Sequence, residues 1–486
     1  MNLMPFTPEL TLAATAIIVI LLDLGIQRKR WLAVVSIIGI VVSGGFTLGM
    51  WGGTPAAIFN NMLVADNFAL FFKLLFLGIA ALVILSSNDY VARFSRFQGE
   101  YYALVLLSAL GMMLMAATTE LISIYIALEL SSIALYALVG FLKDSKSTEA
   151  SLKYLLLGAL SSAVLLFGMA LVFGFTGKTQ LGDIARVLGA MSAQTVIASP
   201  GLLLGMVLIT AGFGFKIAAI PFHMWVPDVY EGAPTPITAY LSVASKAAGF
   251  AVILRVFHSA LGSPSLLSLD WALMFAILAA IGMFVGNITA LPQGNIKRML
   301  GYSSIAQAGY LMVGLATMGL SPATSASGQS TVMFFLAGYA LTNLGAFIAI
   351  IAISNKINSD MIDDFSGMIK RAPLLTLGLS FCLISLIGMP PAVGFMAKFY
   401  IFSGAVKQGL LWLVIIAVIN SVISAYYYLR VVKVMWLGKP ASAETVPSSY
   451  PLRVALSLSC LGVLVLGIVP GLMMKIAEFA GKMFAF

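Results

Sequence analysis

Three lysines, Lys216, Lys246 and Lys398, each stand alone in a long run that is otherwise uncharged. The three runs are residues 187–227, 232–254 and 372–406. A lysine at the centre of a membrane-spanning helix costs about 2.5–3.5 kcal/mol on the lenient insertion scale, so three of them need a function that compensates. Lysine can exchange a proton when the influence of a neighbouring carboxylate changes, whereas arginine stays charged. The pattern therefore predicts proton transfer, unless the side chains extend to the membrane surface.

A carboxylate and a fourth lysine belong to the same set of candidates. Glu129 lies near the middle of the apolar stretch IYIALELSSIALY, and Lys153 lies near the predicted cytoplasmic start of the next apolar stretch. A buried carboxylate beside a lysine can ionise, which allows the pair to pass a proton. The alternative for Glu129 is a purely structural ion pair, and the alternative for Lys153 is a side chain that extends to the surface. The candidate proton-transfer residues are Glu129, Lys153, Lys216, Lys246 and Lys398.

The composition requires a membrane around these residues. The chain has 486 residues, a mean hydropathy of +1.04, 61% hydrophobic residues and only 9% charged residues. Soluble chains carry about 25% charged residues, so this chain lacks the side chains for an ordinary water-exposed surface. The net charge of +9 indicates basic loops on one side of a bilayer and not nucleic-acid binding. Cys382 and Cys460, the only cysteines, lie in apolar runs, which argues against a disulfide framework or a cysteine metal site.

Apolar segments long enough to cross a bilayer fill nearly the whole chain. A helix needs roughly 20 residues to cross the hydrocarbon core. Fourteen such segments can be placed, at 9–27, 31–51, 67–87, 101–118, 121–141, 153–175, 203–225, 236–258, 270–291, 300–319, 331–353, 373–403, 410–437 and 453–477. The connections between them are short, so the sequence leaves no room for a soluble domain.

Basic residues are unevenly distributed between the two sets of loops. The loops after odd-numbered spans hold most of them: Arg28, Lys29, Arg30, Arg93, Arg96, Lys143, Lys146, Lys297, Arg298, Lys356, Lys370, Arg371 and Lys439. The loops after even-numbered spans hold few: Lys178, Arg186, Lys407, Lys475 and Lys482. The positive-inside rule places the first set in the cytoplasm. With an even number of spans, both termini are then expected on the non-cytoplasmic side.

A short repeat relates two of the predicted spans. SSIALYALVG at residues 131–140 recurs, with two extra residues, as SSIAQAGYLMVG at residues 303–314. The copies fall in spans five and ten, and an offset of five spans makes them cross the membrane in opposite directions. The pattern predicts an inverted repeat, with spans four to eight matched to spans nine to thirteen. The expected segments are a three-helix start at 1–100, two repeats at 101–260 and 261–438, and a last helix at 439–486.

Prolines interrupt the corresponding span of each repeat. Pro221 follows Lys216 in span seven, and Pro390 and Pro391 precede Lys398 in span twelve. Proline kinks or breaks a helix, and the freed backbone must be buried in protein or line a wet cavity, which we expect here. Paired broken helices mark the ion site in transporters, although a kink that only adjusts packing is the alternative. The expected fold is an all-α membrane protein of about fourteen transmembrane helices, with two inverted five-helix repeats and two broken helices.

Motifs around these residues resemble a known family. The segment FKIAAIPFHMWVPDVYEGAPTPITAYLSVASKAAGF, residues 215–250, is similar to the antiporter-like subunits of respiratory complex I. The segments QGNIKRMLGYSSIAQAGY and GFMAKFYIF agree, and the resemblance covers nearly the whole chain. PFHMWVPDVYEGAPTP looks most like the smallest of the three antiporter-like subunits. Lys398 favours this smallest subunit or the L-type subunit, because the M-type subunit of the family has a glutamate there.

The resemblance implies a proton pump driven by NADH oxidation and quinone reduction in other subunits. The first half-channel would hold the Glu129–Lys216 pair and Lys246, with Lys153 as a further candidate, and the second would end at Lys398. The subunit itself would bind no NAD, flavin or iron–sulfur cluster, and the sequence has no motif for them. Its partners would be M-type and K-type membrane subunits, the lateral helix of the L-type subunit, and the lipid of a bacterial plasma membrane.

Two other functions are compatible with the sequence. A subunit of a multi-subunit sodium/proton antiporter would work from an ion gradient without NADH. An inert scaffold would only hold a membrane assembly together, and its buried lysines would be dispensable for transport. Residue types alone do not separate sodium from protons as the transported ion.

Overall fold

The computed structural model describes most of the chain. The described residues are 3–92, 97–191, 195, 198–261, 265–318, 322–440 and 442–482, without the side chains of 265–270 and 322–327. Arg93 and Arg96, two of the basic loop residues named above, lie outside the described residues. Within this range the chain is almost entirely helical, and its one small sheet pairs β1 (Ala56–Ile58) with β2 (Leu63–Ala65) in antiparallel orientation.

The helices follow one another through short connections. The first half of the chain forms α1 (Thr7–Gly25), α2 (Arg30–Gly49), α3 (Asn67–Val91), α4 (Gln98–Ala117), α5 (Leu121–Val139), α6 (Ser145–Thr176), α7 (Leu181–Ala190), α9 (Pro200–Ile217), α10 (Trp225–Gly232), α11 (Thr235–Tyr240) and α12 (Lys246–Val256). The second half forms α13 (Ser265–Ala290), α14 (Ile296–Met318), α15 (Pro322–Ile357), α16 (Met368–Arg371), α17 (Pro373–Ile387), α18 (Val393–Lys407), α19 (Leu411–Leu437), α20 (Tyr450–Ile468) and α21 (Pro470–Ala480). Short 3-10 or π turns occupy Met4–Phe6, Leu241–Ser245, Phe257–Leu261 and Ile362–Phe365.

Twelve helices among the described residues are long and apolar enough to cross a membrane. They coincide with twelve of the fourteen predicted spans. Of the other two, span 300–319 corresponds to α14, and span 373–403 is divided into α17 and α18, which have 15 residues each. Protein surrounds α14 along nearly its whole length, so its polar side chains need not meet lipid. The prediction of an all-α membrane protein is confirmed.

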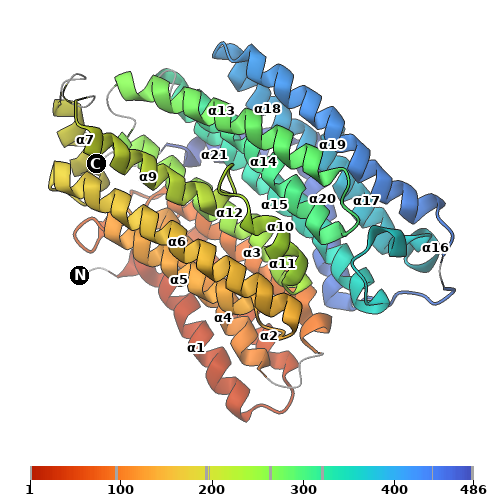
Figure 1. Ribbon diagram of the computed structural model, residues 1–486. Helices are drawn as coiled ribbons and strands as arrows, with labels where there is room; N and C mark the ends of the chain where they lie inside the picture. The colour runs from red at the N-terminus through yellow and green to blue at the C-terminus, as the bar shows by residue number, and fades with distance from the viewer. Residues whose placement is uncertain are drawn as a thin grey trace.

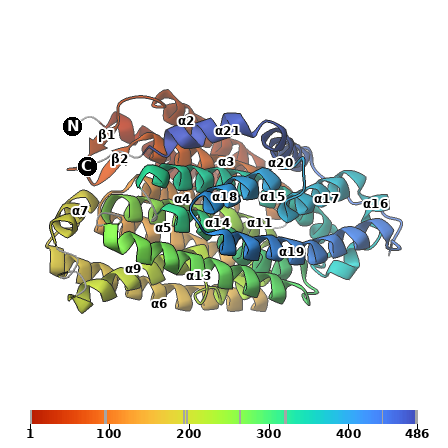
Figure 2. The ribbon, with the colours of Figure 1, turned by 90° about the horizontal axis from the view of Figure 1, so that it is seen from above.

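The long helices lie side by side in one flattened bundle (Figure 1). Both ends of the chain are marked at the end of the bundle that holds α7, and α16 lies at the opposite end (Figures 1 and 2). Seen from above, α2, α3, α20 and α21 form one face, and α6, α9 and α13 form the opposite face (Figure 2). The last long helix, α20, packs against α3 and α15, so the C-terminal segment returns to the N-terminal one.

Both predicted helix breaks are present. Pro221 lies between α9 and α10, and Pro390 and Pro391 lie between α17 and α18. In each broken span, the first helix is followed by a residue whose backbone is in the left-handed conformation. This residue is Ala218 (φ 60°) after α9 and Gly388 (φ 93°) after α17. This conformation is a common end for a helix, because it turns the chain away from the helix axis. The predicted span 203–225 is too long at its C-terminal side, since the helix stops before the proline.

Glycines bring α6 and α9 into close contact. A Cβ added at Gly212 would lie 2.6 Å from the Cβ of Leu165, and one added at Gly168 would lie 2.8 Å from the carbonyl oxygen of Gly205. Neither position has room for a larger side chain, and small residues of this kind allow membrane helices to approach closely. Gly212 is one turn before Lys216, so this contact holds the lysine end of α9 against α6.

A π-helical turn, Leu241–Ser245, interrupts predicted span 236–258 directly before Lys246. Single π turns inside α-helices are frequent at functional sites, because they rearrange the local hydrogen-bond ladder and the side chains that follow. The apolar pattern of the sequence contains no signal for this turn. It is therefore a feature that only the folded chain reveals.

Candidate functional site

Lys216 lies at a buried junction of α5, α6 and α9. It is 3% exposed, and its Nζ donates a hydrogen bond of 2.7 Å to Oγ of Ser132 on α5. Glu129, three residues before Ser132, is half-buried and accepts a hydrogen bond from Ser162 on α6. Among the described residues no direct ion pair joins Glu129 to Lys216. The two predicted partners are therefore close together but separated by hydroxyl groups.

A small polar cavity lies between these side chains. Its volume is about 10 Å³, and Ser132, Tyr136, Ser162 and Lys216 contribute to its wall. A single water needs about 10–15 Å³ when the space for its centre is counted. Gly158 makes room for the hydroxyl group of Tyr136, because a Cβ at Gly158 would lie 2.0 Å from that oxygen. The space is about the size of one water and lies between Lys216 and Ser162, which donates a hydrogen bond to Glu129.

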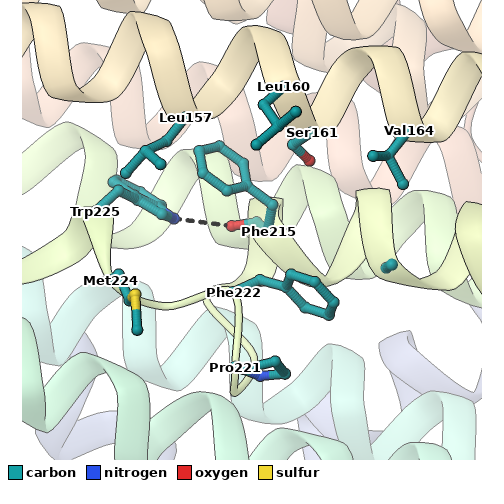
Figure 3. Close-up of a pocket in the computed structure, with 10 residues that line it drawn as sticks. Leu157, Leu160, Ser161, Val164, Phe215, Pro221, Phe222, Met224 and Trp225 are labelled. Atoms are coloured by element: carbon teal, nitrogen blue, oxygen red, sulfur yellow. Dashed lines mark hydrogen bonds between the residues drawn. The ribbon is translucent and has the colours of Figure 1, made fainter.

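Aromatic side chains close the helix break next to Lys216 (Figure 3). Nε1 of Trp225, the first residue of α10, donates a 3.0 Å hydrogen bond to the carbonyl oxygen of Phe215 in the last turn of α9. The indole also stacks on Tyr154 of α6, with ring centroids 4.6 Å apart. The carbonyls of a last helical turn lack regular partners, so the indole donor supports the end of α9. Together these contacts hold α6, α9 and α10 around the lysine.

The larger space beside this break is apolar. A cavity of about 210 Å³ lies between α6 and the break, and its wall includes Leu157, Leu160, Val164 and Phe222 (Figure 3). Cavities lined by such side chains stay dry. Phe215 and Ser161 border both this cavity and the small one, and Ser161 is the polar side chain among the residues of the larger wall. This space gives no support to the wet cavity expected at the break, because the residues around Pro221 present mainly apolar side chains to it, and that expectation stays a prediction.

Lys246 lies on the helix next to Lys216. It is 2% exposed, and its Nζ donates to the hydroxyl and the carbonyl oxygen of Ser304 on α14. Gly249, three residues later on α12, packs against α9, where a Cβ would lie 3.2 Å from the Cβ of Lys216. Lys246 is therefore about one helical turn along α12 from the residue that contacts Lys216. Ser132 and Ser304 are the second serines of the two SSIA copies, so each copy supplies a hydroxyl group to one buried lysine.

Lys398 on α18 reaches back into the second helix break. Its Nζ donates to the carbonyl oxygens of Leu386 (3.1 Å) and Ile387 (2.8 Å) and to Oγ of Ser421 on α19 (2.6 Å). Gly388 leaves space for the lysine, because a Cβ there would lie 3.0 Å from Cδ of Lys398. The two carbonyls belong to the C-terminal end of α17, where the helix dipole favours a cation.

One face of α14 connects the sites of Lys246 and Lys398. Ser304 accepts from Lys246, and Gln307, three residues later, donates through Nε2 to the carbonyl oxygen of Leu386 at 3.3 Å. The same carbonyl accepts from Lys398. Neither Ser304 nor Gln307 was selected from the sequence. The sequence does hold a signal for Ser304 and Gln307. They are polar residues three apart, so they lie on one face of a predicted span.

Lys153 lies apart from this connected series. Its side chain is 43% exposed and forms ion pairs with Glu149 (2.7 Å) and Asp228 (2.8 Å). Nine residues of α6, about 13 Å of helix, separate it from Ser162, which contacts Glu129. The structure brings the other four candidates into one series and leaves Lys153 at the surface end of α6.

Asp228 on α10 ties α6 to α14 at this surface. Its carboxylate accepts hydrogen bonds from Lys153 at 2.8 Å and from Nη1 of Arg298 at 2.7 Å. Partial burial raises the pKa of Asp228, but the hydrogen bonds from Lys153 and Arg298 outweigh the burial and hold that pKa below its ordinary value. The short helix after the first break is thereby anchored to one helix from each of the two expected repeats.

Removal of the Asp228 charge is expected to weaken the fold in a pH-dependent way. Because its pKa is lower in the folded protein than in the unfolded chain, the carboxylate stabilises the fold above the unfolded pKa of about 3.9. This contribution is lost as the pH falls through the folded value. Asp228→Asn should cost roughly 1 kcal/mol at neutral pH, and its difference from the unaltered protein should vanish once the pH lies below the folded pKa of Asp228.

Thermal unfolding of both proteins across this pH range measures the difference. Glu149→Gln is the matched control, since Glu149 also pairs with Lys153 but leaves both hydrogen bonds of Asp228 in place. A stability loss in Asp228→Asn that is the same at every pH would contradict the assignment.

Two buried ion pairs lie outside the lysine series. Lys73 on α3 pairs with Glu9 on α1 at 2.7 Å, and Arg255 on α12 pairs with Asp66 at 2.8 Å, with all four side chains at most 2% exposed. Both pairs tie the N-terminal helices to their neighbours. The Arg255–Asp66 pair was not predicted, because nothing local in the sequence links residues so far apart. Within the described part of the chain, no three His, Cys, Asp or Glu side chains are grouped to hold a metal ion.

Comparison with known proteins gives consistent matches along the chain. Residues 118–424 match the family described as "NADH:quinone oxidoreductase/Mrp antiporter, TM". NADH-quinone oxidoreductase subunit N of Dehalococcoides mccartyi is 49% identical over 480 residues, which cover 98% of this chain and 99% of that protein. The protein of the same name from Trichlorobacter lovleyi is 45% identical over 488 residues, covering 99% of this chain and 97% of that protein.

Solved structures share the same helical arrangement. A chain of respiratory complex I from Thermus thermophilus with bound aureothin matches with a TM-score of 0.81 and 32% identity, covering 96% of this chain and 98% of that chain. A chain of the Mrp complex from Dietzia sp. DQ12-45-1b matches with a TM-score of 0.86, covering 99% of this chain and 97% of that chain. The identity to the second is 19%, so that likeness concerns the fold alone.

Proposed function

The chain belongs to the NADH:quinone oxidoreductase/Mrp antiporter transmembrane family, and we propose that it is subunit N of NADH-quinone oxidoreductase, respiratory complex I. The observation that carries this assignment is the identity of 49% to a protein of that name over nearly the full length of both chains. In this role the chain is a multi-pass membrane subunit that moves protons. Electron transfer to quinone takes place in other subunits, and this subunit holds no redox cofactor.

The proton path runs from the Glu129–Lys216 pair through Lys246 to Lys398. Its support is a polar contact at each lysine: the hydroxyl group of Ser132 at Lys216, Ser304 at Lys246, and the Leu386 carbonyl at Lys398, which Gln307 of α14 also uses. Between Lys216 and Lys246 the support is the close packing of α9 on α12 at Gly249. A lysine that gives up its proton becomes a neutral acceptor, so the same residue can pass successive protons along the series.

The path divides into two halves that follow the expected repeats, 101–260 and 261–438. Segments 1–100 and 439–486 flank them. In support, each half has one broken helix, and each copy of the SSIA motif supplies one serine to a buried lysine. The first half takes up the proton and the second half releases it.

Lys153 acts where protons enter from the cytoplasm. Its half-exposed side chain and its acidic neighbours Glu149 and Asp228 support a role in collecting protons at the end of α6. The basic loops belong to the same side, so both termini lie on the non-cytoplasmic side of a bacterial plasma membrane. M-type and K-type subunits flank this subunit, and the lateral helix of the L-type subunit runs along it.

Purification of the tagged chain from its native membrane tests the assignment. We expect it to bring along subunits with iron–sulfur clusters and quinone reductase activity, and the complex to pump protons after reconstitution into liposomes. Recovery of an assembly without redox subunits, active only with an imposed ion gradient, would instead identify a sodium/proton antiporter.

A further inference from the structure

The second helix break surrounds the ammonium group of Lys398 with uncharged acceptors alone. The three acceptors are the carbonyl oxygens of Leu386 and Ile387 and Oγ of Ser421, at 3.1, 2.8 and 2.6 Å from Nζ. The ring of Tyr310 lies against the same nitrogen, which is 4.5 Å from the ring centroid. An alkylammonium group has three N–H donors, so three acceptors satisfy it completely. Among the described residues, no carboxylate forms an ion pair with Lys398.

Several features of the break favour a positive charge without a counter-ion. The two carbonyls end α17, where the helix dipole is negative and the last carbonyls lack regular helical partners. The face of an aromatic ring attracts a cation, most strongly when water is excluded, and Lys398 is only 4% exposed. Carbonyls at the ends of broken helices bind small cations in transporters for the same reasons.

The first break lacks this arrangement. The carbonyl oxygen of Phe215, in the last turn of α9, accepts from the indole of Trp225 and not from the lysine. Lys216 has a single hydroxyl acceptor, Ser132, among the described residues. The three oxygen acceptors around Nζ of Lys398, here called the oxygen cage, are therefore particular to the second break. A lysine near a broken helix does not by itself produce such a cage.

We propose that the break between α17 and α18 is a binding site for a primary ammonium ion, which the side chain of Lys398 fills as a tethered ligand. The cage oxygens recognise the ammonium group itself. A free alkylammonium ion therefore binds there when the tether is removed. The site rests on its own geometry and goes beyond the proposed proton path, which requires only that Lys398 exchange a proton.

The Lys398→Ala complex tests the proposal by chemical rescue. Alanine keeps Cβ and removes three carbons and the nitrogen, so n-propylammonium is the best replacement. The test is to measure the thermal unfolding and the quinone reductase turnover of the purified variant complex in the presence of methyl-, ethyl-, n-propyl- or n-butylammonium. Propylammonium should act at about 1–10 mM, as suits so small a ligand, and should raise the unfolding temperature by at least about 1 °C.

Three controls make the rescue specific. In Lys398→Gly, which also lacks Cβ, the preferred ion should change from propylammonium to butylammonium. Tetramethylammonium has no N–H donor and should have no effect on either variant. Adding Ser421→Ala to Lys398→Ala removes one acceptor and should weaken the propylammonium response about tenfold or more.

The outcomes separate this site from the proposed function. The ammonium site is overturned if alkylammonium ions change neither the unfolding temperature nor the turnover of both Lys398 variants. It is also overturned if the ions act equally on the unaltered complex and on Lys216→Ala, in which Lys398 still fills the site. A stabilisation by propylammonium without recovery of turnover supports the site and counts against a proton-transfer role of Lys398. Recovery of both supports the two together.

Discussion

In the Lys216→Ala variant, we expect proton pumping coupled to quinone reduction to fall at least about tenfold while the complex still assembles. Lys216 is buried, makes its hydrogen bond to Ser132 and is the one cation among the described residues that line the small polar cavity. The loss of the side chain leaves Glu129, held by Ser162, without the lysine to which it would pass a proton. Assembly should survive, because the contact between α6 and α9 depends on glycines and not on this side chain.

The measurement is the number of protons moved per electron in reconstituted vesicles, with the subunit content checked in parallel. Lys216→Arg should be equally inactive, because arginine keeps the charge but does not release its proton. Lys407→Ala is the matched control, since Lys407 is an exposed lysine at the end of α18. A normal proton-to-electron ratio in assembled Lys216→Ala would refute the proposed path and favour an inert scaffold.

Replacement of Arg255 by alanine should destabilise the folded chain by about 3–5 kcal/mol, because it removes the counter-ion of the buried Asp66 carboxylate. The guanidinium group donates to both carboxylate oxygens of Asp66, at 2.8 and 3.0 Å, and to the carbonyl oxygen of Ala116 at 2.9 Å. Phe68 stacks on it, with Cζ 4.7 Å from the ring centroid. A shift of this size should lower the amount of assembled complex in the membrane severalfold.

Two further variants show whether the charge pair itself is responsible. Arg255→Lys keeps the charge but cannot make the bidentate hydrogen bond to Asp66. Its amount of assembled complex should therefore lie between those of the unaltered protein and Arg255→Ala. The double variant Asp66→Asn with Arg255→Met removes both charges and should recover part of the stability, since paired removal of buried ions is far less costly than removal of one. Wild-type levels of Arg255→Ala would show that the pair contributes little.

The local properties of the sequence account for much of the fold. Hydropathy is a property of each segment, so twelve of the fourteen predicted spans coincide with helices that can cross a membrane. Proline also acts locally, so Pro221 and Pro390 were enough to place the breaks. The two exceptions have physical reasons. α14 is shielded from lipid by other helices and can carry polar side chains, and the half-helices α17 and α18 are each too short to cross alone.

The sequence by itself singled out Lys216, Lys246 and Lys398, because each stands alone in an uncharged run. Only the tertiary structure decided what each lysine touches. It pairs Lys216 with Ser132, Lys246 with Ser304, and Lys398 with the end of α17. It also leaves Lys153 at the surface and makes the space at the first break apolar. These contacts join helices that are distant in the chain, and their distances depend on close packing at glycines such as Gly212 and Gly249, which no local pattern encodes.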